Sequence, residues 1–130
     1  MSFPNIRSMF LGDGGNSGGP EIISASSAVQ FHGDADTVFV DVRSLGEIMA
    51  SGTVAGAVRA PLPEFTRHAV ADGSGSLPMA SASIRIICVC ASGARSGAAA
   101  QQLLAMGYTN VANLRGGIGA WMQAGGPLER

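Results

Sequence analysis

The sequence predicts one α/β domain, in which a parallel sheet carries helices on both of its faces. Short apolar runs rich in β-branched residues alternate along the chain with segments of helical composition. That alternation is typical of parallel sheets, because a helix connects each strand to the next. The clearest strand is Ile84–Cys90 (IRIICVC), which is apolar at every position but one. A nearly continuous apolar strand indicates a sheet that is covered on both faces.

Cap and turn residues divide the first half of the predicted domain into elements. Ser24 is a suitable N-cap for a helix, a β-branched run follows as a strand, and Gly52 ends the next helix. Pro63 stands at a favourable first-turn position for a further helix. In chain order these elements are the strand Ile22–Ile23, the helix Ser26–Phe31, the strand Thr37–Val42, the helix Leu45–Ala50, the extended piece Gly56–Pro61 and a helix from Pro63 to about Ala69.

The second half contains a strand, loop and helix, followed by one more strand and one more helix. DGSGS at Asp72–Ser76 indicates a loop before the strand Ile84–Cys90. The segment Ser96–Met106 is dense in Ala, Gln and Leu, which favour helices, and Gly107 marks its end. The last two predicted elements are the strand Thr109–Leu114 and the helix Ile118–Ala124.

The first residues, Met1–Pro20, have a different composition from the rest of the chain. They include the glycine-rich run GDGGNSGGP, which offers little apolar surface and great backbone freedom. We therefore expect a flexible arm over residues 1–20 and a domain over Glu21–Arg130. Gly15–Gly19 match the G-x-S-x-G pattern of serine hydrolases, but that pattern carries chemistry only between a strand and a helix. The match is interpreted as accidental.

Composition and charge exclude several classes of partner. The 130 residues are 46% hydrophobic and 13% charged, with a formal net charge of −1. A domain of this size buries roughly two thirds of its unfolded surface, so we expect it to need no metal and no other cofactor. All basic residues are arginines spread singly along the chain, whereas nucleic-acid binding needs clustered basic residues. No apolar run reaches the length of a membrane helix. We expect neither a nucleic-acid nor a membrane partner.

The two cysteines, Cys88 and Cys90, are separated by one residue on the predicted strand. Side chains at this spacing share one face about 7 Å apart, which is too far for a relaxed disulfide. We therefore expect two free thiols. Free thiols, together with an N-terminus that lacks the apolar core of a signal peptide, predict a cytoplasmic protein. Cys88 lies inside the strand and is interpreted as a core residue rather than a resolving thiol.

Cys90 ends its strand at the edge of the sheet where parallel α/β folds bind ligands. The residues after it are small as far as an arginine: Ala91, Ser92, Gly93, Ala94, Arg95 and Ser96. Such a loop lets several backbone N–H groups face one centre, and the N-terminus of the next helix completes an anion-binding nest. These donors and a nearby cation lower the pKa of a thiol. The pattern favours Cys90 as a nucleophile over a buried structural thiol.

Other candidate bases and ligands are less well placed. His32 and His68 are both far from the Cys90 loop in sequence and are interpreted as surface or packing residues. Neither these histidines nor the two cysteines have the spacing of common zinc ligands, so the sequence predicts no metal site.

Five segments of the chain resemble the rhodanese family of sulfurtransferases. They are VDVRSLGEI at Val40–Ile48, GTVAGAVRAP at Gly52–Pro61, CASGARS at Cys90–Ser96, GYTNVANLRGGIGAW at Gly107–Trp121 and AGGPL at Ala124–Leu128. Together they cover nearly everything from Glu21 onward. The resemblance implies a single-domain member of the family with a rhodanese-like five-stranded parallel sheet.

By this resemblance Cys90 carries a persulfide and Ala91–Arg95 complete its loop. The thiolate would attack the outer sulfur of a donor such as thiosulfate, and the persulfide would pass that sulfur to cyanide or a cellular thiol. Related cysteine phosphatases have a loop one residue longer than Cys90–Arg95. The resemblance therefore favours sulfur transfer.

Three arginines and one aspartate are candidates for supporting roles. Asp41 and Arg43 occupy the family's Asp-Val-Arg segment, either as a buried pair that locks the strand end or as groups that set the field around the loop. Arg59 is either a contact for an anionic donor or a solvated side chain. Arg95 points either into the pocket or to solvent.

Two residues depart from the commonest pattern of the family. Thr53 stands where a histidine is frequent, and Ala91 stands where many thiosulfate-using members carry a basic residue. Any contact made by that histidine is therefore absent, and Arg95 is the charged residue of the loop.

The sequence thus predicts a sulfurtransferase that acts through a Cys90 persulfide, with a small-molecule sulfur donor and a thiol or cyanide acceptor. One alternative is a noncatalytic persulfide carrier or binding module that delivers sulfur to a protein acceptor. Another is a cysteine phosphatase or arsenate reductase, which the loop length disfavours.

Overall fold

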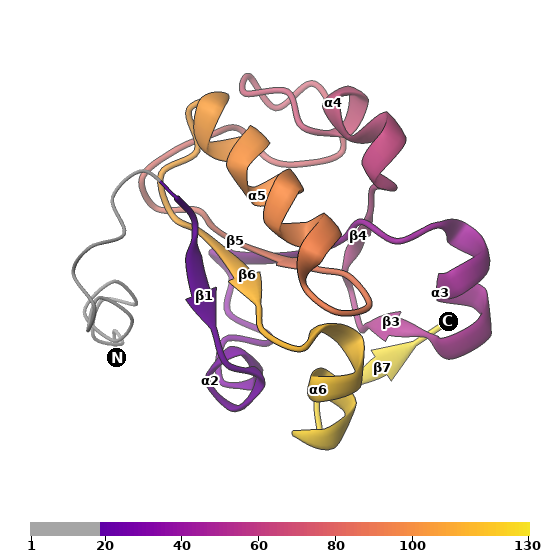
Figure 1. Cartoon of the computed structure of the whole chain (residues 1–130). Coiled ribbons are helices and arrows are strands. Elements are labelled where there is room, and N and C mark those ends of the chain that lie inside the picture. The colour runs from indigo at the N-terminus through magenta and orange to yellow at the C-terminus, as the bar shows by residue number, and fades with distance from the viewer. Residues whose placement is uncertain (1–18) are drawn as a thin grey trace.

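Five parallel strands form the main sheet of the computed structural model, which describes residues 19–130 (Figure 1). The strands are β1 (Glu21–Ile23), β2 (Thr37–Asp41), β4 (Val58–Arg59), β5 (Arg85–Val89) and β6 (Val111–Leu114). Their spatial order is β1-β6-β5-β2-β4, and every neighbouring pair is parallel. The predicted five-stranded parallel sheet is confirmed. The strand β5 that precedes Cys90 lies at its centre.

Helices cover both faces of the sheet, as predicted (Figure 1). The helices α4 and α5 pack on one face, and α2 and α6 pack on the other. The helical elements are α2 (Ala25–Val29), α3 (Leu45–Ser51), the 3₁₀ turn η2 (Leu62–Glu64), α4 (Phe65–His68), α5 (Ala94–Ala105) and α6 (Gly117–Gln123). None of the helices in residues 19–130 combines the length and apolarity needed to cross a membrane.

The side chains of β5 show why this strand is apolar throughout. Ile86 and Cys88 belong to the buried cluster beneath α5, and Ile87 and Val89 belong to the cluster beneath α2 and α6. Successive side chains of a strand point to opposite faces. A central strand with both faces covered therefore needs apolar residues at odd and even positions alike.

The helix after Cys90 begins earlier than the sequence indicated. The expected helix Ser96–Met106 is observed as α5, which starts at Ala94, so Ala94 and Arg95 belong to its first turn rather than to the loop. Gly93 is the N-cap and has a φ of +114°, a backbone conformation that glycine adopts without a Cβ clash. The chain can therefore turn from loop to helix at Gly93.

One pair of strands was not predicted. β3 (Thr53–Val54) and β7 (Leu128–Glu129) form a separate two-stranded antiparallel sheet. Each of them is two residues long, which is too short to show a periodic pattern. Most of the predicted arm, residues 1–18, lies outside the residues that the structure describes, and so does most of the G-x-S-x-G match.

Candidate active site

Cys90 lies between the end of β5 and the start of α5, at the carboxyl edge of the sheet. The backbone N–H of Gly93 donates to the Cys90 Sγ atom over 2.9 Å. The Ser96 hydroxyl lies 3.3 Å from the same Sγ atom and can also donate to it. The structure therefore places a helix N-terminus, a loop amide and a hydroxyl around one sulfur atom, an arrangement that favours negative charge there.

The pKa of the Cys90 thiol reflects two opposing effects. Burial, the largest single influence, disfavours the thiolate and raises the pKa. Hydrogen bonds from the Ser96 side chain and from the backbone amides of Ser96, Gly93 and Ser92 act in the other direction. Together these donors outweigh burial, and they lower the pKa of Cys90 below the ordinary value of a cysteine. A larger share of the thiol is therefore ionised at neutral pH.

The sulfur is covered by its own loop. Cys90 has 0% of its surface exposed, whereas Ala91, Ser92 and Ala94 are exposed above it. The side chains of these three residues are small, and all three follow Cys90 within four positions of the chain.

A glycine at the start of α6 fits tightly against the loop. A Cβ on Gly117 would lie 2.3 Å from the backbone oxygens of both Cys90 and Ala91. The next residue, Ile118, donates its N–H to the Cys90 carbonyl over 2.9 Å. These contacts support the loop from the far side of Cys90. Sequence analysis did not single out Gly117, although two adjacent glycines between a strand and a helix are a signal of close backbone approach.

Arg95, in the first turn of α5, is paired with a residue of α3. Arg95 donates to both carboxylate oxygens of Glu47, over 2.7 and 2.9 Å. Hydrogen bonds from Arg95, and then from the Ser44 amide, lower the pKa of Glu47 to about 2. Glu47 also closes a capping box with Ser44 at the start of α3. The charge of the Arg95 guanidinium is therefore balanced by a carboxylate.

A polar side chain from β6 also reaches the loop. Asn113 donates its Nδ2 to the Gly93 carbonyl over 2.9 Å and accepts a 2.5 Å hydrogen bond from the Ser96 hydroxyl. Sequence analysis missed this residue. Its one signal is a polar side chain inside the otherwise apolar end of the predicted strand Thr109–Leu114.

Asp41 and Arg43 form a buried pair at the end of β2. Their side chains are 0% and 3% exposed and meet at 2.8 Å. Arg43 also donates to Ser51 and to the Gly52 carbonyl, and the Thr53 hydroxyl donates to Asp41 over 2.7 Å. The pair joins the end of β2 to the end of α3 and to β3. A buried pair that locks the strand end is one of the two arrangements that the sequence left open for these residues.

Comparisons with known proteins identify a family over the part of the chain that contains this site. The family model for the rhodanese-like domain matches residues 24–124. The chain belongs to the rhodanese-like domain family.

Individual relatives of this rhodanese-like domain cover most of the chain. It is 34% identical over 108 residues to a sulfurtransferase of Allochromatium vinosum, a match that spans 83% of the chain and 92% of the relative. A protein of unknown function from Rhodopseudomonas palustris, described as a possible tyrosine phosphatase, has a similar structure, with a TM-score of 0.72 and 29% identity over 99% of the chain and 98% of that protein. A rhodanese-related protein from Thermoplasma volcanium matches with a TM-score of 0.65 and 25% identity, over 83% and 96% of the two chains.

The second cysteine of the rhodanese-like domain lies deep in its core. Cys88 is fully buried in the cluster beneath α5, and both it and Cys90 are free thiols. Burial, followed by the nearby charge of Cys90, raises the pKa of Cys88 to about 12. Cys88 therefore remains a protonated thiol at neutral pH, which suits core packing and not the attack on a persulfide.

The remaining candidates for a role in the site of the rhodanese-like domain, Arg59 and the two histidines, are bonded to other residues. Arg59 forms an ion pair with Glu129 at 4.0 Å and takes no part in the hydrogen bonds and ion pairs of the Cys90 loop. His32 lies 2.8 Å from the Ala55 carbonyl, within hydrogen-bond distance, and packs against Phe39 and Trp121. His68 is hydrogen-bonded to Ser76. The two histidines therefore have the packing and surface roles that the sequence suggested.

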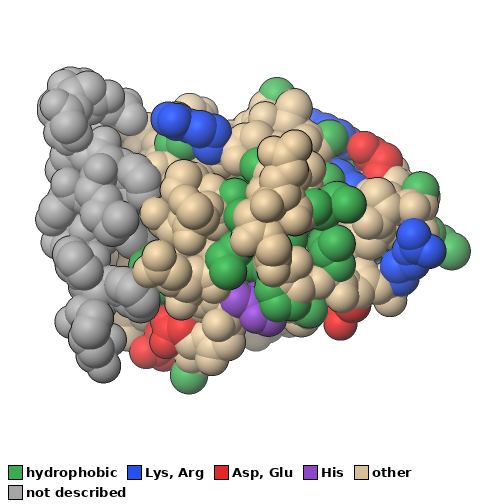
Figure 2. Space-filling model, turned by 90° about the horizontal axis from the view of Figure 1, so that it is seen from below, with side chains coloured by type: hydrophobic (Ala, Val, Ile, Leu, Met, Phe, Trp, Pro, Cys, Tyr) green, Lys and Arg blue, Asp and Glu red, His purple; other side chains and the backbone are tan. Residues whose placement is uncertain are grey.

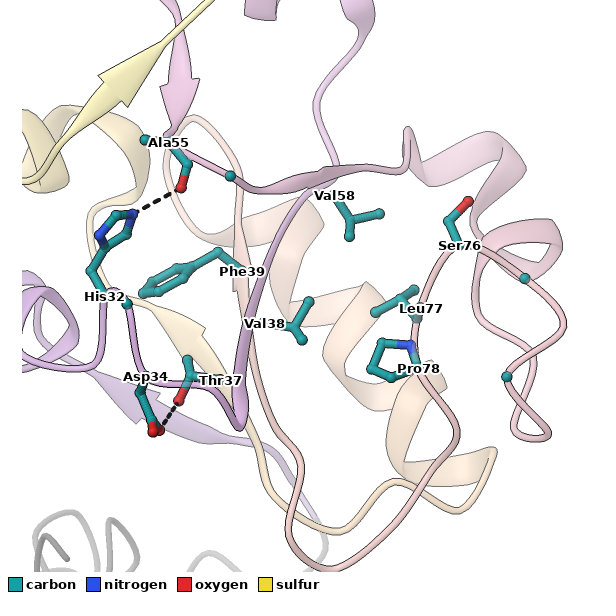
Figure 3. A pocket seen from close by; sticks show the side chains of 14 residues that line it. His32, Asp34, Thr37, Val38, Phe39, Ala55, Val58, Ser76, Leu77 and Pro78 are labelled. Atoms are coloured by element: carbon teal, nitrogen blue, oxygen red, sulfur yellow. Dashed lines mark hydrogen bonds between the residues drawn. The ribbon is translucent and has the colours of Figure 1, made fainter. Parts of the chain in front are cut away.

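The cavity drawn in Figure 3, about 750 Å³ in volume, lies away from the Cys90 loop. It is lined by the start of β2 and the loop around Leu77, and its lining does not include Cys90 or the residues after it. Two of its lining residues are already hydrogen-bonded, His32 to the Ala55 carbonyl and Asp34 to Thr37 (Figure 3).

Figure 2 shows the lower face of the molecule, where hydrophobic side chains gather at the middle and charged ones lie around the edge.

Proposed function

We propose that this rhodanese-like domain is a sulfurtransferase that moves sulfane sulfur through a persulfide on Cys90. The observation that carries the proposal is the pair of donors on Sγ, the Gly93 amide and the Ser96 hydroxyl, at the N-terminus of α5. The same donors that favour a thiolate also favour the terminal sulfur of a persulfide, because both carry negative charge. Membership of the family and the likeness to a sulfurtransferase support the same reaction.

The reaction has two halves. In the first, the Cys90 thiolate attacks the outer sulfur of a donor such as thiosulfate, the sulfur–sulfur bond of the donor breaks, and sulfite leaves with the bonding electron pair. In the second, cyanide or a thiolate attacks the outer sulfur of the persulfide and forms a carbon–sulfur or sulfur–sulfur bond to it, the sulfur–sulfur bond to Cys90 breaks, and the electron pair of that broken bond returns to Cys90 as a thiolate. The residues Ala91 to Ser96 supply the amides and the hydroxyl that hold the charge during both steps.

Asp41 and Arg43 serve this site as its support, since they fix the end of β2 beside β5. Arg59, which pairs with Asp41 in the sheet register, stays a candidate contact for an anionic donor. Because both cysteines are free thiols, the reducing cytoplasm is the compartment that suits the protein.

The charge around the loop indicates which class of sulfur donor the site favours. Arg95, in the first turn of α5 after the loop, is charged, and its guanidinium is held by Glu47. Thiosulfate carries two negative charges and gains most from an unpaired cation, whereas a thiol persulfide carries one negative charge or none. The balanced Arg95–Glu47 pair favours a persulfide donor over thiosulfate among the sulfane sulfur compounds.

The proposal is tested by steady-state transfer from thiosulfate, and from a small-molecule persulfide, to cyanide and to a thiol. We expect turnover with wild-type protein and none with Cys90→Ser. Labelling of Cys90 with one sulfur but no turnover on small acceptors would instead identify a carrier that delivers sulfur to a protein. Hydrolysis of an aryl phosphate, or reduction of arsenate, without sulfur transfer would overturn the proposal in favour of the phosphatase or reductase reading.

A further inference from the structure

Asn113 reaches the Cys90 loop because β6 lies beside β5. In the sheet register Asn113 is paired with Cys88. Paired residues of parallel strands share a face, and so do residues two apart on one strand. The side chain of Asn113 therefore lies on the face that carries Cys90 and α5. There it contacts the first turn of the helix.

The orientation of the Asn113 amide is fixed by its two partners. The Gly93 carbonyl only accepts hydrogen bonds, so the group that faces it at 2.9 Å must be the Nδ2 donor. The Oδ1 atom is then left to accept from the Ser96 hydroxyl, at 2.5 Å. One side-chain amide thus holds Gly93 and Ser96, two of the residues that donate to Cys90 Sγ.

The Ser96 hydroxyl has one proton and two acceptors within reach, Asn113 Oδ1 at 2.5 Å and Cys90 Sγ at 3.3 Å. While Cys90 is a thiol, its S–H can donate to Ser96 and Ser96 can donate to Asn113. When Cys90 ionises, the hydroxyl can turn its proton to the sulfur. Asn113 holds the Ser96 oxygen beside the sulfur in the thiol state, so the hydroxyl needs only to rotate when Cys90 ionises.

Asn113 also restrains the backbone of Gly93. A glycine is free to adopt many backbone conformations, and the φ of +114° at Gly93 is one among them. Its carbonyl is held by Asn113 Nδ2 and by the N–H of Gly97. The fit is close, since a Cβ on Gly97 would lie 3.2 Å from Asn113 Nδ2.

We propose that Asn113 is a positioning residue for Cys90, which fixes the Ser96 hydroxyl and the Gly93 backbone so that both donate to Sγ. The inference rests on the proposed function only in taking Cys90 as the reactive sulfur. It predicts that the ionisation of Cys90 depends on a residue that does not contact the sulfur.

The test is the ultraviolet absorbance of the Cys90 thiolate as a function of pH in the full chain, which needs no sulfur donor. We expect Asn113→Ala to lower the thiolate fraction about tenfold at a given pH below the midpoint, which is the scale of one hydrogen bond to a charged group. Ser96→Ala should do the same, and Ser96→Ala with Asn113→Ala should shift the midpoint by less than the sum of the two single shifts. Asn110→Ala, at the other end of β6, is the matched control and should leave the midpoint unchanged.

Asn113→Leu provides a second, neutral variant of nearly the same size, in case Asn113→Ala does not fold. Its side chain has neither a donor for the Gly93 carbonyl nor an acceptor for Ser96, so we expect a higher midpoint here too. A wild-type midpoint in folded Asn113→Ala or Asn113→Leu, or full additivity in the double variant, would overturn the assignment. A shifted midpoint in a protein that transfers no sulfur would leave the assignment standing and refute the proposed function.

Discussion

Replacing Gly117 by alanine should disrupt the site by a steric clash between the new Cβ and the backbone of the Cys90 loop. The new Cβ would lie 2.3 Å from the Cys90 and Ala91 oxygens, whereas ordinary contacts begin at 3.4 Å, so the loop backbone has to move by about 1 Å. A displacement of this size in a reacting group costs roughly 100-fold in rate. The φ of +63° adds a backbone strain of about 1–2 kcal/mol for any residue with a Cβ. We expect kcat/KM for sulfur transfer to fall about 100-fold.

Gly119→Ala is the matched control for this experiment. Gly119 lies on the same helix, α6, and a Cβ there would meet nothing within 4 Å. Alanine in place of glycine inside a helix adds up to about 1 kcal/mol of stability. Urea unfolding should therefore place Gly119→Ala at or above wild type and Gly117→Ala below it. Wild-type kcat/KM in Gly117→Ala would refute the argument that the start of α6 supports the Cys90 loop.

Three further predictions concern the loop and its partners. Gly93→Ala has room for its side chain, since the nearest atoms lie 3.9 Å away, but φ is +114°; sulfur transfer should fall while urea unfolding shows a loss of roughly 1 kcal/mol, and unchanged activity would show that the loop does not depend on the backbone conformation of Gly93. Ser96→Ala removes a donor that lowers the pKa of Cys90; because the thiolate is the reactive form, the acid limb of the pH–rate profile should move to higher pH, and an unmoved limb would contradict the role of the hydroxyl. Glu47→Gln removes the charge that balances Arg95; KM for thiosulfate should fall several-fold relative to KM for a thiol persulfide, with equal changes in both counting against the charge argument.

The contribution of the ion pair between Arg95 and Glu47 to stability depends on pH in the acid range. The folded pKa of Glu47 is lowered to about 2, mainly by the hydrogen bonds from Arg95. A lowered carboxylate pKa contributes stability above the unfolded value, and that contribution is lost as the pH falls toward the folded value. Since both side chains are more than a third exposed, solvent reduces the size of this contribution. The pair is intact throughout the neutral range in which sulfur transfer would be measured.

The parts of the site that are local in sequence were predictable. Cys90 and Gly93 lie in one short run between a clear strand and a clear helix, so their meeting follows from the chain itself. The central strand was equally clear, because a strand buried on both faces has to be apolar throughout. The helix start was misplaced by two residues, since the backbone conformation of Gly93 is set by the loop contacts and not by helix propensity.

Contacts between distant segments were not predictable. Asn113 and Gly117 reach Cys90 through the pairing of β5 with β6, and one sequence does not reveal which side chains a sheet register brings together. The direction of Arg95 depends on Glu47, which precedes it by 48 residues. The strands β3 and β7 pair with each other, but each is two residues long, which is too short to show the alternating pattern of a strand.

The most direct test of the account is the intact mass of the protein after incubation with a sulfane sulfur donor and removal of the excess. The wild-type chain should gain the mass of one sulfur atom, lose it again on exposure to cyanide, and do so with Cys88 unmodified. Cys90→Ser should gain nothing while keeping its fold. A sulfur atom retained by Cys90→Ser, or located on Cys88 in the wild type, would contradict the assignment of Cys90 as the sulfur carrier.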